Sequence, residues 1–143
     1  MELRFTKTER RGHLPKQARP GDAGLDLDAT EDHELQPGER KMIGTGVAVE
    51  IPEGYAGLVL PRSGLATRYG LTLINSPGLI DPGYRGEILV AVVNQDPSQA
   101  VKIKRGDRVA QLVVVGLPGI EPVLVEALSD TERADGGFGS TGS

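Results

Sequence analysis

The sequence predicts an all-β fold, a small sandwich or barrel of short strands joined by turns. Its 143 residues include 20 glycines and 10 prolines, which is typical of a chain with many short elements. Turn signals such as Pro-Gly and Gly-Asp recur at a spacing of about ten residues, the rhythm of a sandwich or barrel. The length is that of one domain, and no repeat or internal linker interrupts it.

Four stretches are expected to be strands. In Val47–Ile51 and Val101–Lys104 apolar residues alternate with small or polar ones, which predicts one buried face. Ile88–Val93 and Leu112–Val115 are continuously apolar and largely β-branched. Such runs fit strands that are buried on both faces, either inside a compact sandwich or at a subunit interface.

One short helix and a flexible tail complete the predicted architecture. Ser63–Tyr69 can form about two helical turns, and Gly70 provides the stop signal. Residues 134–143 hold one large apolar side chain, Phe138, among glycines and hydroxyls, so burial cannot order them. The tail is either a flexible linker or a segment that orders over a ligand, since its N–H groups and hydroxyls can donate to phosphate.

Composition excludes several classes of function. The net charge of -4 gives no basic field for nucleic acid or an anionic membrane. Without cysteine the chain has no disulfide, thiolate metal site or cysteine nucleophile, and two histidines make a histidine zinc site a poor prospect. No apolar run approaches the roughly 18 residues of a membrane span, and the first residues lack a signal peptide. We therefore expect a cytoplasmic protein with neither nucleic-acid nor membrane partners.

Two polar sites in the first half of the chain, Asp26 and the pair Arg62 and Ser63, can each be interpreted in two ways. Asp26 lies in a predicted half-buried strand and is either a solvated carboxylate or a functional one. Arg62 and Ser63 precede the helix, where a guanidinium, a hydroxyl and unpaired N–H groups suit a phosphate. Alternatively, Ser63 is the N-cap of the helix and Arg62 points into solvent.

The second half offers three more candidates. Gly78–Glu87 predicts a β-hairpin with its turn at Asp81, Pro82 and Gly83. Asp81 either forms that turn or holds a carboxylate that orients and deprotonates a water. Tyr84 either closes a small pocket or packs in the core, and Gln111, in an apolar stretch, needs a partner or a ligand.

Together, five segments resemble the five ordered motifs of the homotrimeric dUTPases: AGLDLDA, PRSGLA, GLIDPGYRGEI, RGDRVAQLV and RADGGFGSTG. The resemblance covers residues 21–142, and five motifs in order are far more specific than any one. It implies a jelly-roll-like β-sandwich over residues 1–132 and a flexible arm over residues 133–143 that closes over the active site. It also implies a homotrimer with active sites at the subunit interfaces.

The activity implied by the resemblance is Mg²⁺-assisted hydrolysis of dUTP to dUMP and pyrophosphate, which keeps uracil out of DNA and supplies dUMP for thymidylate synthesis. Tyr84 would lie under the deoxyribose and leave no room for a ribose 2′-OH. Asp81 would hold the 3′-OH side of the sugar and act as the base for the attacking water. The residues expected to read the uracil edge are Asn75, Gly78, Leu79, Ile80 and Leu89.

The triphosphate would be held by a separate set of residues, again by resemblance. Asp26 would hold water molecules of the Mg²⁺ shell. Arg62, Ser63, Gly64 and Gln111 would bind the phosphate chain. The arm residues expected to close over the substrate are Arg133, Phe138, Ser140 and Thr141, with Phe138 stacked on uracil.

The chain departs from the family pattern in the arm and the turn. Ala134 stands where a second glycine is expected after the arginine, and alanine does not readily adopt a positive φ. Pro82 and Gly83 fill the variable pair between Asp81 and Tyr84. Two alternatives remain beside dUTP hydrolysis. One is a dCTP deaminase-like enzyme of the same fold, a family that lacks the glycine-rich motif. The other is a nucleotide-binding regulator without turnover.

Overall fold

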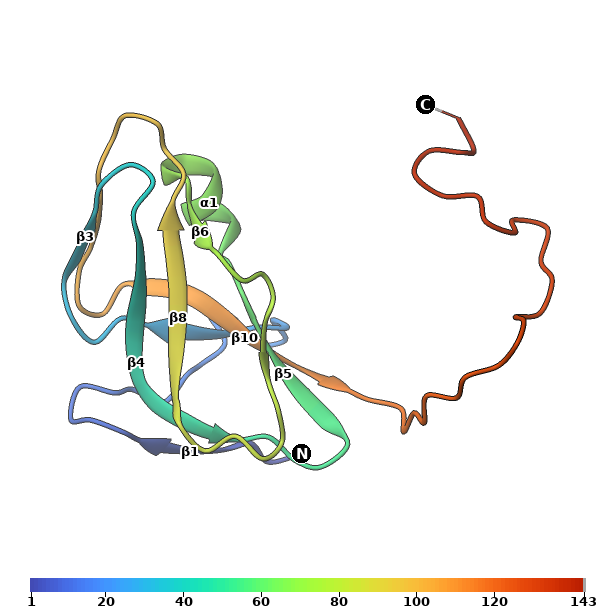
Figure 1. Ribbon diagram of the computed structural model, residues 1–143. Coiled ribbons are helices and arrows are strands. Elements are labelled where there is room, and N and C mark those ends of the chain that lie inside the picture. The colour runs from blue at the N-terminus through green and yellow to red at the C-terminus, as the bar shows by residue number, and fades with distance from the viewer. Residues whose placement is uncertain (143) are drawn as a thin grey trace.

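The computed structural model describes residues 1–142 and is an all-β sandwich with one short helix (Figure 1). Ser143, the last residue of the expected arm, lies outside the described residues. The elements, in chain order, are β1 (Arg4–Lys7), β2 (Leu25–Asp28), β3 (His33–Leu35), β4 (Arg40–Glu50), β5 (Tyr55–Leu60), α1 (Ser63–Tyr69), β6 (Leu71–Leu73), β7 (Gly78–Ile80), β8 (Glu87–Asn94), β9 (Val101–Ile103) and β10 (Arg108–Gly116).

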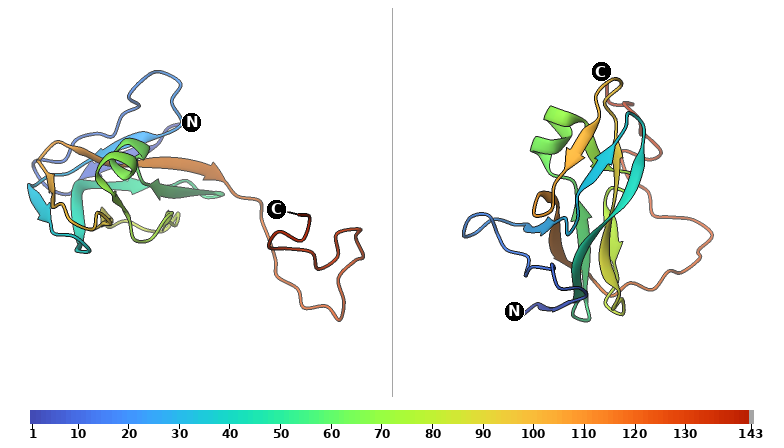
Figure 2. Two further views of the ribbon diagram at one scale, coloured as in Figure 1. Left: turned by 90° about the horizontal axis from the view of Figure 1, so that it is seen from above. Right: turned by 90° about the vertical axis from the view of Figure 1, so that its left-hand side faces the viewer.

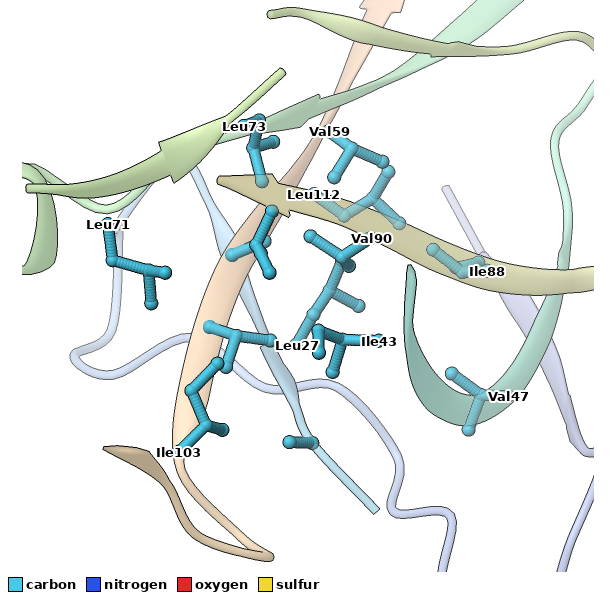
Figure 3. Close-up of a cluster of buried hydrophobic side chains, with 14 of the residues drawn as sticks. Leu27, Ile43, Val47, Val59, Leu71, Leu73, Ile88, Val90, Ile103 and Leu112 are labelled. Carbon is cyan, nitrogen blue, oxygen red and sulfur yellow. The ribbon is translucent and has the colours of Figure 1, made fainter. Parts of the chain in front are cut away.

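The strands form two four-stranded sheets and one pair. One sheet has the order β1-β4-β8-β6 and the other the order β2-β10-β5-β7, while β3 pairs with β9. All the ladders are antiparallel. Buried side chains of both large sheets meet in one core, where Val90 of β8 lies close to Leu112 of β10 (Figure 3). The expected all-β, jelly-roll-like sandwich is confirmed.

The apolar strands are buried less completely than the sequence predicts. In β8, Ile88, Val90 and Val92 are buried, but Leu89 on the other face is 48% exposed. Burial on both faces is therefore wrong for β8 within one chain, because a sandwich covers only one face of each sheet. In β10 only Leu112 is buried among the four apolar residues of the run.

The two strands predicted from alternating apolar residues, β9 and β4, differ in which side chains are buried. In β9, Val101 and Ile103 are buried and Lys102 is exposed, as predicted. In β4 the side chain of Ala48 is buried together with those of Val47 and Val49. The pairing of β4 with β8 shifts register between Gly44 and Ala48, and β1 covers this part of the strand. The irregularity brings both faces of β4 into contact with protein.

The predicted hairpin at Gly78–Glu87 is wrong. β7 pairs with β5 in one sheet, whereas β8 pairs with β4 and β6 in the other. The turn itself forms, since the Tyr84 N–H donates to the Asp81 carbonyl at 3.1 Å. The chain then crosses between the sheets instead of returning along its own ladder, because both β7 and β8 bury one face in the core between them.

α1 ends as predicted, and a long segment without a strand or helix follows the last strand. α1 spans Ser63–Tyr69 as predicted, and Gly70 adopts the left-handed conformation with φ of 69°. The last strand ends at Gly116, and residues 117–142 run away from the sandwich without a strand or helix (Figures 1 and 2). Over residues 1–142, no helix combines the length and the apolar character that crossing a membrane requires.

Candidate functional site

The pairing of β10 with two neighbours assembles the first part of the site. Gln111 lies opposite Asp26 of β2 on one side and opposite Leu60 of β5 on the other. Arg62 and Ser63 follow directly after the end of β5. Three of the motifs, far apart in the sequence, therefore meet at one edge of this sheet.

Charged and amide groups link these segments. The Asp26 carboxylate is largely buried and lies 3.5 Å from Arg62 Nε and 3.3 Å from Arg108 Nη1. The Gln111 amide donates to the Pro61 carbonyl at 3.0 Å. A Cβ at Gly24 would clash with Gln111 Oε1, so this close approach requires glycine. The amide thus has the partner that its apolar surroundings demand.

These side chains surround a cavity of about 330 Å³, here called the Arg62 pocket. Its lining residues are Ala18, Asp22, Ala23, Gly24, Asp26, Arg62, Ser63, Gly64 and Gln111. Arg62, not Ser63, is the residue that caps α1, and no side chain bonds to the cap. The alternative assignment of Ser63 as the N-cap is therefore wrong. Its exposed hydroxyl stands beside the Arg62 guanidinium, an arrangement that suits phosphate oxygens.

A second cavity, of about 230 Å³, lies between β7 and β8 and is here called the Tyr84 pocket. Its lining residues are Met42, Val59, Leu73, Asn75, Gly78, Leu79, Ile80, Tyr84, Glu87, Ile88, Leu89, Val90 and Ala91. Six of the residues expected to recognise the nucleoside are among them. The lining is mostly apolar, with Asn75, Tyr84, Glu87 and backbone groups as its polar part, which suits a flat base.

Tyr84 and Asp81 are fixed by short-range contacts beside this pocket. The Tyr84 hydroxyl donates to the Glu87 carbonyl at 2.9 Å. A Cβ at Gly86 would lie 2.7 Å from Tyr84 Cζ, so the ring lies against this glycine. Asp81 follows the buried Ile80 and is exposed. Its carbonyl forms the turn while its carboxylate stays open to solvent, so the turn role does not occupy the acid group.

The two pockets share no lining residue, and the arm contacts neither of them. Arg133 Nε donates to the Gly136 carbonyl within the arm, and Phe138 is fully exposed. Ser140 donates its N–H to Gly137. Thr141 is exposed. Within one chain, the residues of the Tyr84 pocket, those of the Arg62 pocket and those of the arm therefore form three separate groups, and the C-terminal segment lies away from the sandwich (Figure 2).

Two charged residues that the sequence did not single out belong to the Arg62 region. Arg108 pairs with Asp26 and its carbonyl accepts Arg62 Nη1 at 3.4 Å. Burial raises the pKa of the Asp28 carboxyl, and Asp26 adds to this effect while His13 and Arg108 oppose it. The only sequence signal for Arg108 was its place within RGDRVAQLV, since spacing does not identify its partner across the sheet.

The residues present fit a magnesium ion bound mostly by substrate. Among residues 1–142 no group of three or more carboxylates, histidines or cysteines could hold an ion alone. Asp22 and Asp26 nevertheless line the Arg62 pocket with hard oxygen atoms. Because Mg²⁺ retains several water molecules and takes other ligands from phosphates, one or two such carboxylates are sufficient.

A third cavity, of about 760 Å³, lies between α1 and the segments around β9 and the start of β10 and is larger than both pockets. Of the expected site residues, only Arg62 lines it. The larger volume therefore does not coincide with the residues expected from the motifs.

Comparison with known proteins agrees with the five motifs. The dUTPase family model matches residues 10–142. The deoxyuridine 5′-triphosphate nucleotidohydrolase of Thermobifida fusca is 55% identical over 129 residues, covering 90% of this chain and 72% of that protein. The enzyme of the same name from Cutibacterium acnes is 56% identical over 131 residues, and the match covers 90% of this chain and 85% of that enzyme.

Solved structures show the same fold. The dUTPase of Staphylococcus bacteriophage 80alpha with dUpNHpp has a TM-score of 0.92 and 31% identity, with 99% of each chain covered. A mutant dUTPase of phage phi11 of S. aureus, described with a structural Mg(II) ion, has a TM-score of 0.82 and 29% identity, covering 89% of this chain and 98% of that one. The chain belongs to the dUTPase family.

Proposed function

We propose that this chain hydrolyses dUTP to dUMP and pyrophosphate, with Asp81 as the base. The observation that carries this proposal is a nucleoside-sized, mostly apolar pocket beside a solvent-open aspartate, in a chain whose second pocket offers the Arg62 side chain, Ser63 and Gln111 to phosphates. Relatives that share more than half of its residues are named for the hydrolysis of this nucleotide. These relatives and the family match support the hydrolase assignment over a deaminase or a regulator without turnover.

Base and sugar selection take place in the Tyr84 pocket. The β7 backbone at Gly78 lies close to Val59 and to the Asn75 amide, where an added Cβ would meet both at 3.4 Å. We expect uracil to pair with this backbone and with Asn75, while a 5-methyl group finds no space. The ring of Tyr84 lies under the sugar and excludes a 2′-OH. The few polar groups of this pocket disfavour analogues that leave them unpaired.

The chemical step requires only one base and a positioned water. The Asp81 carboxylate accepts a proton from the water as its oxygen attacks the α-phosphorus, and the bond from that phosphorus to the pyrophosphate oxygen breaks in line. No covalent intermediate is needed. The exposed carboxylate, held on a turn next to the Tyr84 pocket, is consistent with this role.

The triphosphate chain lies in the Arg62 pocket in this proposal. Arg62, Ser63, Gly64 and Gln111 bind phosphate oxygens, and Asp26 holds Mg²⁺ through water. Mg²⁺, when bound, would neutralise part of the negative charge on the phosphates. The Arg62 guanidinium adds a fixed positive charge that stabilises the leaving pyrophosphate.

Assembly joins the separate groups. One chain carries the two pockets on non-overlapping sets of residues, and the outer face of β8 exposes Leu89. A homotrimer would bring the Tyr84 pocket of one copy to the Arg62 pocket of another. The arm residues Arg133, Phe138, Ser140 and Thr141 would close over the resulting site. Exposed apolar positions in residues 117–132, such as Leu124, are available for contacts between copies.

Substrate preference tests the proposed function directly. We expect kcat/KM for dUTP to exceed that for dTTP and UTP by at least about two orders of magnitude, because unpaired or clashing groups in a fitted site cost that much or more. Pyrophosphate release measured across dUTP, dTTP, dCTP and UTP provides the comparison. Similar values for all four nucleotides, or ammonia release from dCTP, would refute the assignment.

Replacement of Asp81 tests its role as the base. Asp81→Asn should lower kcat by at least about two orders of magnitude, the usual loss for a general base. Binding of a non-hydrolysable dUTP analogue should persist, because the amide keeps the size of the side chain. The matched control is Asp96→Asn, since Asp96 is also an exposed turn carboxylate. Hydrogen bonds from the Ser98 and Gln99 N–H groups hold the pKa of Asp96 low.

Asp96→Asn should retain full turnover, because asparagine can accept the same two hydrogen bonds. A kcat for Asp81→Asn within a few fold of wild type would show that Asp81 serves the turn alone.

Deletion of the arm tests its contribution to turnover. Deletion of residues 134–143 should leave the thermal midpoint unaltered, because the arm contributes nothing to the core, but it should strongly lower kcat. Phe138→Ala should remove part of the same contribution, roughly 1–3 kcal/mol for a base–aromatic contact. Full activity of the truncated protein would identify the arm as a linker.

A substitution at Ala134 should increase kcat/KM, in contrast to deletion of the arm. It has a φ of 49°, a conformation that costs an alanine about 1 kcal/mol or more. Ala134→Gly should therefore favour this turn and raise kcat/KM by roughly two- to fivefold, after the loss of glycine flexibility is subtracted. A lower kcat/KM in the same assay would show that the closed arm does not use this turn.

A further inference from the structure

The short segment that carries Asp81 and Tyr84 crosses from one sheet to the other. It leaves β7 after Ile80 and enters β8 at Glu87. Its one backbone hydrogen bond within the turn is Tyr84 N–H to Asp81 carbonyl at 3.1 Å. The Asp81 carboxylate itself forms no hydrogen bond or ion pair with the rest of residues 1–142, so its position depends on the turn backbone alone.

One guanidinium holds this turn together. Arg85 Nη1 donates to the Pro82 carbonyl at 2.6 Å and to the Tyr84 carbonyl at 3.1 Å. Arg85 Nη2 lies 3.2 Å from Glu50 Oε1. The side chain therefore bridges the turn and a residue that is 35 positions earlier in the sequence.

Glu50 provides a firm attachment point for the guanidinium. It is the last residue of β4, an 11-residue strand that pairs with β1 on one side and β8 on the other. Its second oxygen lies 3.7 Å from Arg4 Nη1, on β1. The turn is thereby tied to the end of β4, an interior strand of the β1-β4-β8-β6 sheet, to which β7 does not belong.

We propose that Arg85, held by Glu50, is a positioning residue that fixes the turn geometry required for Asp81 to orient the attacking water. A guanidinium suits this task because its planar fork can serve two carbonyls and a carboxylate at once, whereas a lysine ammonium is a single point charge. This inference rests on the proposed role of Asp81 as the base.

The contacts are too exposed to support the fold. The side chains of Arg85 and Glu50 are 55% and 45% exposed, and pairs of this kind contribute little to the stability of a protein. Small displacements of a catalytic group nevertheless reduce turnover, by as much as ~10²-fold for ~1 Å. The effect of Arg85 should therefore appear in kcat rather than in the thermal midpoint.

Substrate binding should be affected much less than turnover. Arg85 contacts Tyr84 at its backbone carbonyl, whereas the Tyr84 ring has contacts of its own, through its hydroxyl bond to the Glu87 carbonyl and its approach to Gly86. The Arg62 pocket shares no residue with the turn. The interactions that bind ground-state dUTP therefore remain when Arg85 is changed, so KM should stay close to that of wild type.

The test compares four single variants of the full chain with wild type, by steady-state kinetics on dUTP and by thermal unfolding. Arg85→Gln should lower kcat roughly tenfold with KM changed less than about twofold, since the misplaced group acts only in the transition state. Glu50→Gln, which keeps the carbonyl contacts, should lower kcat by about two- to fivefold, the scale of one exposed pair.

The other two variants are the conservative rescue and the matched control. Arg85→Lys should recover only part of the kcat lost in Arg85→Gln, because one ammonium cannot hold both carbonyls and Glu50. Arg4→Gln removes the same charge from the other side of Glu50 without touching the turn. Its kcat should stay within about twofold of wild type, since an exposed pair contributes little.

The inference would be overturned by an unchanged kcat in Arg85→Gln, by a rise in KM without a fall in kcat, or by an equal loss in Arg4→Gln. A fall in thermal midpoint that accounts for the lost activity would overturn it as well. Wild type and Asp81→Asn, assayed in parallel, separate this outcome from failure of the proposed function. If wild type turns over dUTP and Asp81→Asn does not, the base assignment stands whatever Arg85→Gln shows.

Discussion

The position of β10 between β2 and β5 is the constraint on which the proposed phosphate-binding half of the site depends. Side chains alternate along a strand, so Leu112 enters the core while the adjacent Gln111 faces the Arg62 pocket. If the register of β10 shifted by one residue, the Gln111 amide would be buried and Leu112 would be exposed. Such a shift is unfavourable because it would remove the apolar side chain of Leu112 from the core. Core packing thereby sets the register that brings Asp26 opposite Gln111 and places Arg62 just beyond the end of β5.

The crossing between the sheets imposes the second constraint, on the nucleoside half. β7 and β8 each bury one face in the same core, and the segment between them must span the gap in six residues, 81–86. This forces a tight turn at the edge of the Tyr84 pocket, which leaves the Asp81 carboxylate open to solvent. Within this segment the Arg85 guanidinium donates to the Pro82 and Tyr84 carbonyls, and Glu50, from β4, holds the guanidinium from outside the turn.

Local sequence signals predicted the local structure well. The bounds of α1, the left-handed Gly70 and the alternating burial of β9 follow from patterns within a few residues. Partners in the tertiary structure were harder to foresee: the outer face of β8 is open, and the expected hairpin at Gly78–Glu87 joins two sheets instead. The motifs contain most of the residues that line the Arg62 pocket and fewer than half of those that line the Tyr84 pocket, and no spacing rule connects Arg108 to Asp26 or Arg85 to Glu50. Such pairs depend on strand order, which short-range patterns do not encode.

We propose that the two pockets of one chain serve two different active sites of an assembly. Mixed assemblies of Asp81→Asn and Arg62→Gln chains, formed by co-expression, test it most directly, because each variant alone lacks one half of the chemistry. If a site takes Asp81 from one copy and Arg62 from another, an equal mixture regains roughly a quarter of wild-type dUTP turnover by random association. If both halves come from the same chain, the mixture stays as inactive as either variant alone, and that result would contradict the claim.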